Sequence, residues 1–187
     1  MCARPSKLIA MKKLLPGKVL LPRAAIARRV AGLGRQIADA YAGHELVIVP
    51  LLTGGLIFTA DLIRRLPIKM RLDVAAVSSY PGKAIRSRGA TIVLPPQLNI
   101  RRRHVLIVDD ILDSGRTLTA MQNMLRRRQA ASVKTCVLLR KEQARRAGLS
   151  ADFIGFDIPD AFVVGYGMDF NHLYRNLPDV VQLKTPL

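Results

Sequence analysis

The sequence predicts an α/β fold, a doubly wound and mostly parallel sheet flanked by helices. Short apolar runs that suit buried strands alternate along the chain with segments of helical spacing, and such alternation implies right-handed crossovers. The chain has 187 residues, 50% of them hydrophobic, which is enough for one domain with a substantial core. No change in composition marks a linker. We therefore expect a single domain over residues 1–187, with a core at about 20–150 and a small hood from about 1–19 and 152–187.

The first third of the chain predicts helix, strand, turn and helix. Apolar residues recur at steps of three or four after Pro22 and predict an amphipathic helix with proline near its start. The run at 46–52 predicts a strand, the Thr-Gly-Gly sequence at 53–55 a turn, and the apolar spacing at 56–66 a second helix.

The middle of the chain predicts further strands around a loop. Residues 73–80 form a strand candidate, and the basic, Gly- and Ser-containing stretch 81–90 has no periodicity and predicts a loop. Residues 91–94 suit a returning strand. The β-branched run 105–108 suits a strand that is buried on both faces.

One more helix and one more strand follow. Leu118, Met121 and Leu125 form the apolar side of a helix whose outer side carries an arginine run. Residues 133–139 predict the next strand.

The composition narrows the partners without selecting one. The formal charge of +17, from 30 basic and 13 acidic residues, favours anionic partners such as phosphorylated metabolites, nucleic acid or an acidic surface. The aromatic content of 5%, with no Trp, gives repeated base stacking little to work with. The two cysteines and three histidines show no ligand spacing for a transition metal. Neither a membrane span nor a secretory signal is recognised, so we expect a cytoplasmic protein.

Residues 109–117 carry the chemistry. In an open parallel sheet ligands bind beyond the carboxyl ends of the strands, and this segment lies between a strand and a helix. The Ser114-Gly115 turn and the N–H groups of the following helix suit a phosphate. Carboxylates at Asp109 and Asp110 suit the hydroxyls of a ribose. The segment therefore predicts a ribose phosphate site, whereas the plainer interpretation is an acidic turn in which Asp113 caps the helix.

Three segments resemble a known family. VLIVDDILDSGRT at 105–117 is similar to the phosphoribosyl-pyrophosphate signature of the type I phosphoribosyltransferases. SADFIGFDIPDAFVVGYGMDFN at 150–171, continuing to YRNLP at 174–178, resembles the purine-binding end of hypoxanthine-guanine phosphoribosyltransferases. PLLTGGLIFTADL at 50–62 resembles that family's pyrophosphate loop and the helix after it. The resemblance implies a purine salvage enzyme that moves the 5-phosphoribosyl group from phosphoribosyl pyrophosphate to N9 of hypoxanthine or guanine, giving IMP or GMP.

The resemblance also implies a role for individual residues. Asp113 would be the catalytic proton acceptor near N7 of the purine. The remaining roles fall into groups: Asp109 and Asp110 for the ribose; Ser114, Gly115, Arg116 and Thr117 for the 5′-phosphate; Leu52, Thr53, Gly54, Gly55 and Arg175 for pyrophosphate; Lys141, Phe162, Val163 and Asp169 for the purine; Ser79 and Tyr80 in a lid; and Asp169 and Asp109 as ligands of Mg²⁺.

Two positions depart from the family pattern. Thr53 stands where a basic residue is frequent in the pyrophosphate loop, and Ala161 stands where Lys is frequent before Phe162. The cations in the expected lid, Arg86 and Arg88 among them, are predicted to compensate for Thr53 by reaching the pyrophosphate.

Alternatives to this function remain at this point. The basic surplus would serve an RNA-binding regulator on the same fold, and a xanthine-preferring relative would share the 6-oxopurine contacts. A homo-oligomer, either a dimer or a tetramer, is expected from the family.

Overall fold

The computed structural model describes residues 17–78 and 90–183. Its elements run β1 (Lys18–Leu21), α2 (Arg23–Ala40), β2 (Leu46–Leu52), α3 (Gly55–Ile63), β3 (Met70–Leu72), β4 (Ala75–Ser78), β5 (Thr91–Leu94), β6 (His104–Leu112), α4 (Arg116–Arg127), β7 (Ser132–Lys141), α5 (Glu142–Arg146), β8 (Phe153–Ile158), β9 (Val163–Val164) and β10 (Val180–Gln182).

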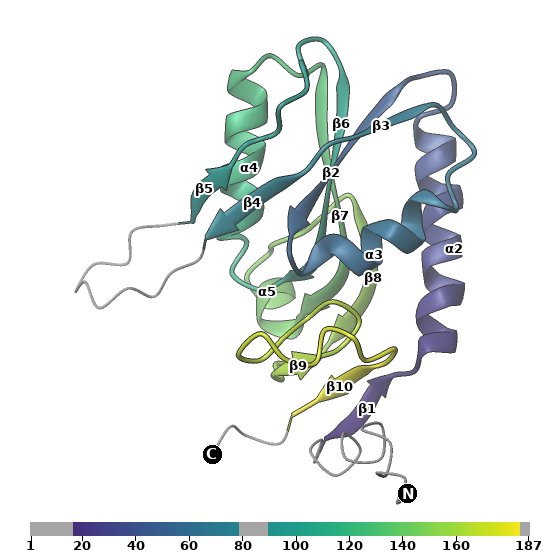
Figure 1. The fold of residues 1–187 in the computed structure, drawn as a ribbon, viewed down its shortest axis with the longest axis vertical. Helices are drawn as coiled ribbons and strands as arrows, with labels where there is room; N and C mark the ends of the chain where they lie inside the picture. Colours follow the sequence, from purple (N-terminus) through teal and green to yellow (C-terminus); the bar gives the residue numbers. More distant parts are fainter. Residues whose placement is uncertain (1–16, 79–89, 184–187) are drawn as a thin grey trace, which may run out of the picture.

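A seven-stranded sheet forms the body of the molecule (Figure 1). Its order is β5-β4-β2-β6-β7-β8, and β3 pairs with the first half of β2. All neighbours are parallel except β4 and β5, which are antiparallel. The predicted mostly parallel, doubly wound sheet is confirmed, and so is the return of residues 91–94 as a strand.

The apolar run of the central strand β6 is continuous because both faces of the strand are buried. Leu106 and Val108 belong to the core that also holds α2 and α3, whereas Val105 and Ile107 belong to the core that holds α4. Alternate side chains of a strand point to opposite faces, so a strand covered by helices on both faces has no polar face. The helices lie on the two sides of the sheet in Figure 1.

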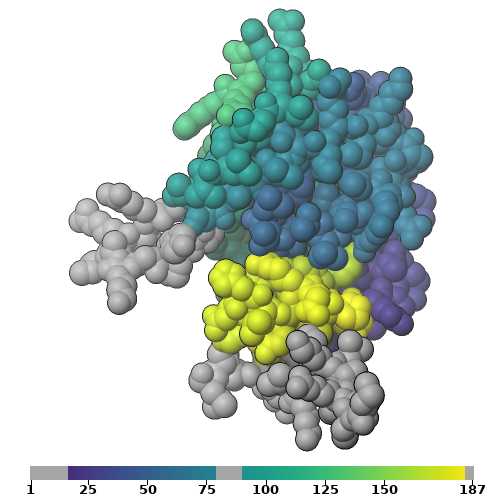
Figure 2. Space-filling view, in the orientation of Figure 1, coloured from purple at the N-terminus to yellow at the C-terminus, as the bar shows by residue number. Residues whose placement is uncertain are grey.

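A second, smaller sheet lies at one end of the body. It has the order β1-β10-β9, and its strands are antiparallel. Figure 2 shows the C-terminal segment (yellow) packed as a cap against the body, beside the N-terminal strand (purple). Val163 and Val180 of this sheet share a core with Leu106 and Val108 of the body.

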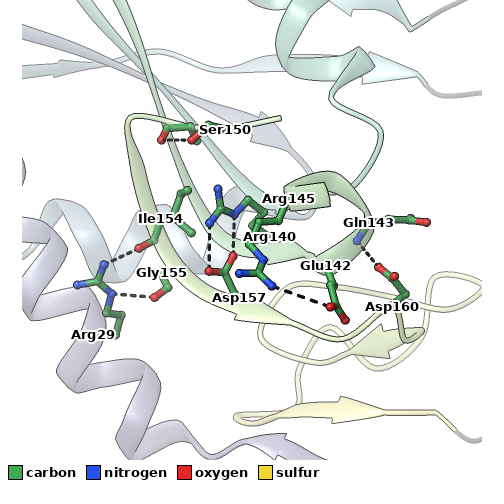
Figure 3. A network of polar contacts seen from close by, with 11 residues as sticks. Arg29, Arg140, Glu142, Gln143, Arg145, Ser150, Ile154, Gly155, Asp157 and Asp160 are labelled. Atoms are coloured by element: carbon green, nitrogen blue, oxygen red, sulfur yellow. Dashed lines mark hydrogen bonds and ion pairs between the residues drawn. The ribbon is translucent and has the colours of Figure 1, made fainter. Parts of the chain in front are cut away.

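The hood was expected to begin at about Asp152, but the next strand, β8, still belongs to the main sheet. This strand pairs in parallel with β7 from Cys136 to Lys141, so it belongs to the main sheet. Arg29 of α2 also holds it there, donating to the carbonyl oxygens of Gly155 at 2.8 Å and Ile154 at 2.5 Å (Figure 3). The small sheet therefore takes up the C-terminal chain only after Ile158.

Among residues 17–78 and 90–183, no helix combines the length and the apolar character that crossing a bilayer requires.

Candidate functional site

The carboxyl ends of the central strands open into a cavity that the segment after β9 also lines. Its volume is about 460 Å³. The walls come from β2, β6, the start of α4 and the segment after β9. The lining residues are Leu51, Leu52, Gly54, Val77, Asp109, Asp110, Ile111, Leu112, Asp113, Ser114, Gly115, Thr117, Leu118, Asp169 and Arg175.

Asp109 and Asp110 lie within β6 and not directly after it. The strand continues to Leu112 because its pairing with β7 continues through Leu112 and Arg140. The expectation of a strand over 105–108 was therefore too short. The two acids interrupt the apolar run without interrupting the pairing, and both face the cavity.

Burial sets the protonation of this acidic pair. Asp109 is only 8% exposed, and its carboxylate accepts the Asp110 N–H at 3.0 Å. The pKa of Asp109 is raised well above the ordinary carboxyl value, mainly by burial and to a smaller degree by the adjacent Asp110. Burial also raises the pKa of Asp110, while Arg175 is one of the groups that oppose the rise. The pair therefore resists holding two negative charges unless donors or a cation enter the cavity.

The turn after β6 leads into a helix N-terminus. Gly115 has the left-handed φ of 71° and precedes α4, which begins at Arg116. Ser114, Gly115 and Thr117 line the cavity, so the first turn of α4, whose N–H groups have no partner within the helix, borders it. Arg116 does not line the cavity, and its side chain is exposed. The plainer interpretation, in which Asp113 caps this helix, is wrong, because Gly115 is the N-cap residue and the Asp113 carboxylate has other partners.

A second cavity of about 240 Å³ adjoins the first. The two cavities share one wall, which consists of Asp110, Ile111, Asp113 and Asp169. The other lining residues of the smaller cavity are Lys141, Phe162, Val163 and Met168. All four residues that were assigned to the purine thus lie around one space.

Asp113 is held by two donors. Lys141 Nζ lies 2.8 Å from Asp113 Oδ2, and Gln143 Nε2 donates to Asp113 Oδ1. Lys141 is the last residue of β7, which is longer at both ends than the expected strand over 133–139. From the end of β7, the Lys141 ammonium group reaches Asp113 in the wall that the two cavities share.

Phe162 offers an aromatic surface beside the smaller cavity. It is 43% exposed, which is unusual for a phenylalanine, and its ring meets Phe170 edge to face at 5.6 Å between centroids. An exposed ring fixed by a second ring is suited to stacking on a planar ligand.

Asp169 and Arg175 pair with each other and also line the larger cavity. Arg175 Nη2 lies 2.7 Å from Asp169 Oδ1, and the His172 N–H donates to Asp169 Oδ2 at 2.8 Å. Arg175 also donates to the carbonyl oxygen of Gly167. Asp169 and Arg175 therefore form an ion pair in the wall of the larger cavity.

The loop between β2 and α3 packs against this wall. The peptide bond between Leu52 and Thr53 is cis. A Cβ atom on Gly54 would lie 1.9 Å from Asp110 Oδ2, so only glycine allows this approach. A Cβ atom on Gly167 would lie 2.4 Å from the Gly54 carbonyl oxygen, so the loop also touches the segment after β9. Gly55 begins α3 behind the cavity, and Thr53 is exposed outside it.

Several expected site residues lie outside the described part of the chain. Ser79, Tyr80, Arg86 and Arg88 fall in 79–89, so the lid and the proposed compensation for Thr53 stay predictions. Ala161, the other departure, is partly buried and packs against the main core.

Sequence reasoning missed residues that complete the site. Ile111 and Met168 line the smaller cavity, Phe170 supports Phe162, and Gln143 holds Asp113. Gln143 and Asp113 are 30 positions apart, and neither spacing nor composition joins them. Ile111 lies inside the signature itself and could have been found from its place between the acids.

No three His, Cys, Asp or Glu side chains gather into a metal site within residues 17–78 and 90–183. Magnesium is usually bound by one or two carboxylates together with substrate phosphates, so a pair of acids beside a phosphate site is the protein contribution that this ion needs.

Comparison with known proteins identifies the family. The model of the phosphoribosyl transferase domain matches residues 18–171. The chain is 42% identical to the hypoxanthine phosphoribosyltransferase of Escherichia coli strain K12 over 163 residues, which is 86% of this chain and 92% of the relative. It is 39% identical to the hypoxanthine-guanine phosphoribosyltransferase of Bacillus subtilis over 167 residues, 89% of this chain and 93% of the relative.

Solved structures agree with the sequence relatives. A hypoxanthine phosphoribosyltransferase from Staphylococcus aureus superposes with a TM-score of 0.86 at 39% identity, covering 94% of this chain and 95% of that chain. These relatives are named for an enzyme activity, so they favour the enzyme over the RNA-binding regulator, and their names include hypoxanthine but not xanthine.

Proposed function

The chain belongs to the phosphoribosyltransferase family, in its hypoxanthine-guanine group, and from this membership we propose that it salvages purines. It transfers the 5-phosphoribosyl group from phosphoribosyl pyrophosphate to N9 of hypoxanthine or guanine and releases pyrophosphate. The observation that carries the proposal is the pair of cavities with a common wall, because it offers one space for a sugar phosphate and an adjoining space for a planar base.

The larger cavity suits the donor. The N–H groups at Ser114–Thr117 would hold the 5′-phosphate at the start of α4, and Asp109 and Asp110 would accept hydrogen bonds from the ribose hydroxyls. Those hydroxyl donors, and the entry of positive charge, would favour the ionised forms of this buried acidic pair. The loop at Gly54 and the guanidinium of Arg175 would face the pyrophosphate.

The smaller cavity suits a 6-oxopurine. Phe162 would stack on the ring, Lys141 would donate to O6, and Val163 would offer its backbone groups to the edge of the base. In the reaction, N9 forms a bond to ribose C1 while the bond from C1 to the pyrophosphate oxygen breaks. Asp113 would take the proton from N7, which becomes acidic as N9 loses electron density.

The donor phosphates imply a divalent cation. Asp169 and Asp109 would hold Mg²⁺ together with substrate oxygens, and when bound the ion would neutralise the negative charge that develops on pyrophosphate. Arg175, which already contacts Asp169, would carry part of the same electrostatic stabilisation.

The proposal extends to the assembly and the location. A homo-oligomer, dimer or tetramer, follows from the family resemblance, and exposed Leu56 and Ile57 at the start of α3 would suit contact with a second copy. The cytoplasmic location remains a prediction from the sequence.

The direct test supplies phosphoribosyl pyrophosphate with hypoxanthine, guanine, xanthine or uracil and follows nucleotide and pyrophosphate together. We expect IMP and GMP, little product from xanthine and none from uracil. Asp113→Asn should lower the rate by about 10²–10⁴-fold, the usual contribution of a positioned general base. The matched control Asp39→Asn, on the exposed side of α2, should leave the rate unchanged. Absence of purine nucleotide from the unaltered protein would refute the proposal.

A further inference from the structure

Gln143 contacts the proposed proton acceptor without lining either cavity. It is the second residue of the short helix α5, which follows β7, and its side chain is exposed. Its Nε2 group donates to Asp113 Oδ1. The contact brings a residue with no expected role in substrate binding to the one carboxylate that would handle a proton.

The two donors on Asp113 differ in charge. Lys141 is a cation 2.8 Å from Oδ2, and Gln143 is a neutral amide on Oδ1. Lys141 also lines the cavity for the base, where O6 of a purine would compete for its ammonium group. Gln143 faces no such competitor.

The main chain of Gln143 is anchored as well. Its N–H donates to Asp160 Oδ1 at 2.8 Å, the contact drawn between α5 and the loop after β8 in Figure 3. Asp160 lies two residues before Phe162 in the chain. The start of α5 is therefore tied to the loop that carries the stacking ring, and this tie fixes the point from which the Gln143 side chain reaches Asp113.

We infer that Gln143 is a positioning residue for the reaction, and this inference rests on the proposed function. It holds the Asp113 carboxylate toward N7 while Lys141 turns to O6 of the purine. When O6 draws the Lys141 ammonium group away, the Gln143 amide remains on Asp113 Oδ1 and keeps the carboxylate in place.

The test compares variants of similar length at position 143. Gln143→Met removes the donor and keeps the shape, and Gln143→Glu places a second carboxylate against Asp113. Single-turnover measurement is the suitable assay, because slow product release can hide the chemical step. Arg146→Met, on the same helix and with a 70% exposed side chain, is the matched control.

We expect Gln143→Met to lower the single-turnover rate by about 10-fold, the scale of one hydrogen bond to a charged group, with KM values for donor and purine unchanged. The acid limb of its rate profile should move to higher pH, because the ionised form of Asp113 loses a donor. Gln143→Glu should move that limb further in the same direction, because like charges raise the pKa of a carboxyl group. Arg146→Met should match the unaltered protein.

Three outcomes would overturn the inference while leaving the proposed function intact. In the first, Gln143→Met keeps the unaltered rate and pH profile. In the second, its rate falls but the acid limb stays in place for both variants, which assigns a structural role, and thermal unfolding of each variant would then show the loss. In the third, KM rises and the single-turnover rate at saturation is unchanged. If the unaltered protein forms no purine nucleotide, the proposed function fails instead.

Discussion

Gly54 should be indispensable for a steric reason that can be tested by adding one methyl group. Its backbone angles, φ −61° and ψ −44°, are ordinary for any residue, so glycine is not needed for its conformational freedom. The close neighbour is Asp110, whose Oδ2 lies 1.9 Å and Cγ 2.5 Å from the place where a Cβ atom would be. Gly54→Ala must therefore displace the loop, the carboxylate or both.

The size of the displacement follows from these distances. Real Cβ contacts are essentially never shorter than 3.0 Å, so the loop and the carboxylate must separate by about 1.1 Å. Overpacking of this kind typically costs about 1–3 kcal/mol of folding free energy. A misplacement of about 1 Å in a reacting site can cost on the order of 10²-fold in rate. We expect kcat/KM for phosphoribosyl pyrophosphate to fall by about this factor.

The control is the same substitution at Gly32, inside α2. There the nearest atom to a new Cβ is Arg29 Nη1 at 3.7 Å, an ordinary contact. Alanine is favoured over glycine within a helix by about 1 kcal/mol, so Gly32→Ala should raise Tm by roughly 2–4 °C and leave the rate unchanged. Steady-state kinetics and thermal unfolding of both variants decide the matter. A Gly54→Ala protein as active as the Gly32→Ala protein would show that the loop does not depend on contact with Asp110.

Three further perturbations test other parts of the structure. Asp109→Asn should raise Tm at neutral pH. Burial, and after it the neighbouring acid, raises the pKa of this carboxyl group in the folded protein, so the contribution of Asp109 to stability falls as pH rises above the ordinary carboxyl range. Unfolding near pH 3.5 should show no gain in Tm, and a lower Tm at both pH values would contradict this reasoning. Phe162→Ala should weaken purine binding by about 1–3 kcal/mol, measured as KM for the base, whereas the exposed Leu173→Ala in the same segment should not. Arg29→Met removes two hydrogen bonds to β8 and should lower the free energy of unfolding by about 2 kcal/mol in denaturant titrations. The control Arg28→Met, on the exposed side of the same helix, should change that free energy by less than about 0.5 kcal/mol.

The strands that were predicted well are those whose pattern is local. The run Leu46–Leu52 predicted β2 at its observed bounds, because every residue in it is apolar and a glycine turn follows. The prediction for β6 ended too early, since the acids at 109 and 110 suggested that the strand was over. Pairing with β7 decides that boundary, and pairing is not visible in a single segment.

The elements that were missed depend on tertiary contacts. β8 contains Gly155 and Asp157, which weaken its strand pattern, and Asp157 is matched across the sheet by Arg140 at 2.6 Å (Figure 3). The helix α5 has five residues, too few for a periodic pattern. The long helix α2, by contrast, has enough turns for its apolar stripe to predict it, and it begins directly after the expected Pro22.

The candidate site was predictable where a motif is contiguous. The segment 109–117 predicted the acids and the helix N-terminus, and resemblance added Lys141, Phe162 and Asp169, all of which line the cavities. Arg116 was included because it belongs to the motif, yet its side chain is exposed outside the cavities. A contact of Arg116 with the 5′-phosphate would therefore come from its backbone N–H group at the start of α4.

The common wall of Asp110, Ile111, Asp113 and Asp169 has a consequence for inhibitor design. A compound that links a base-like ring to a phosphonate across this wall would occupy both spaces with one molecule, and the second contact would form at a high effective concentration. A short, stiff linker should serve best, because it leaves little freedom to be lost when both ends are bound.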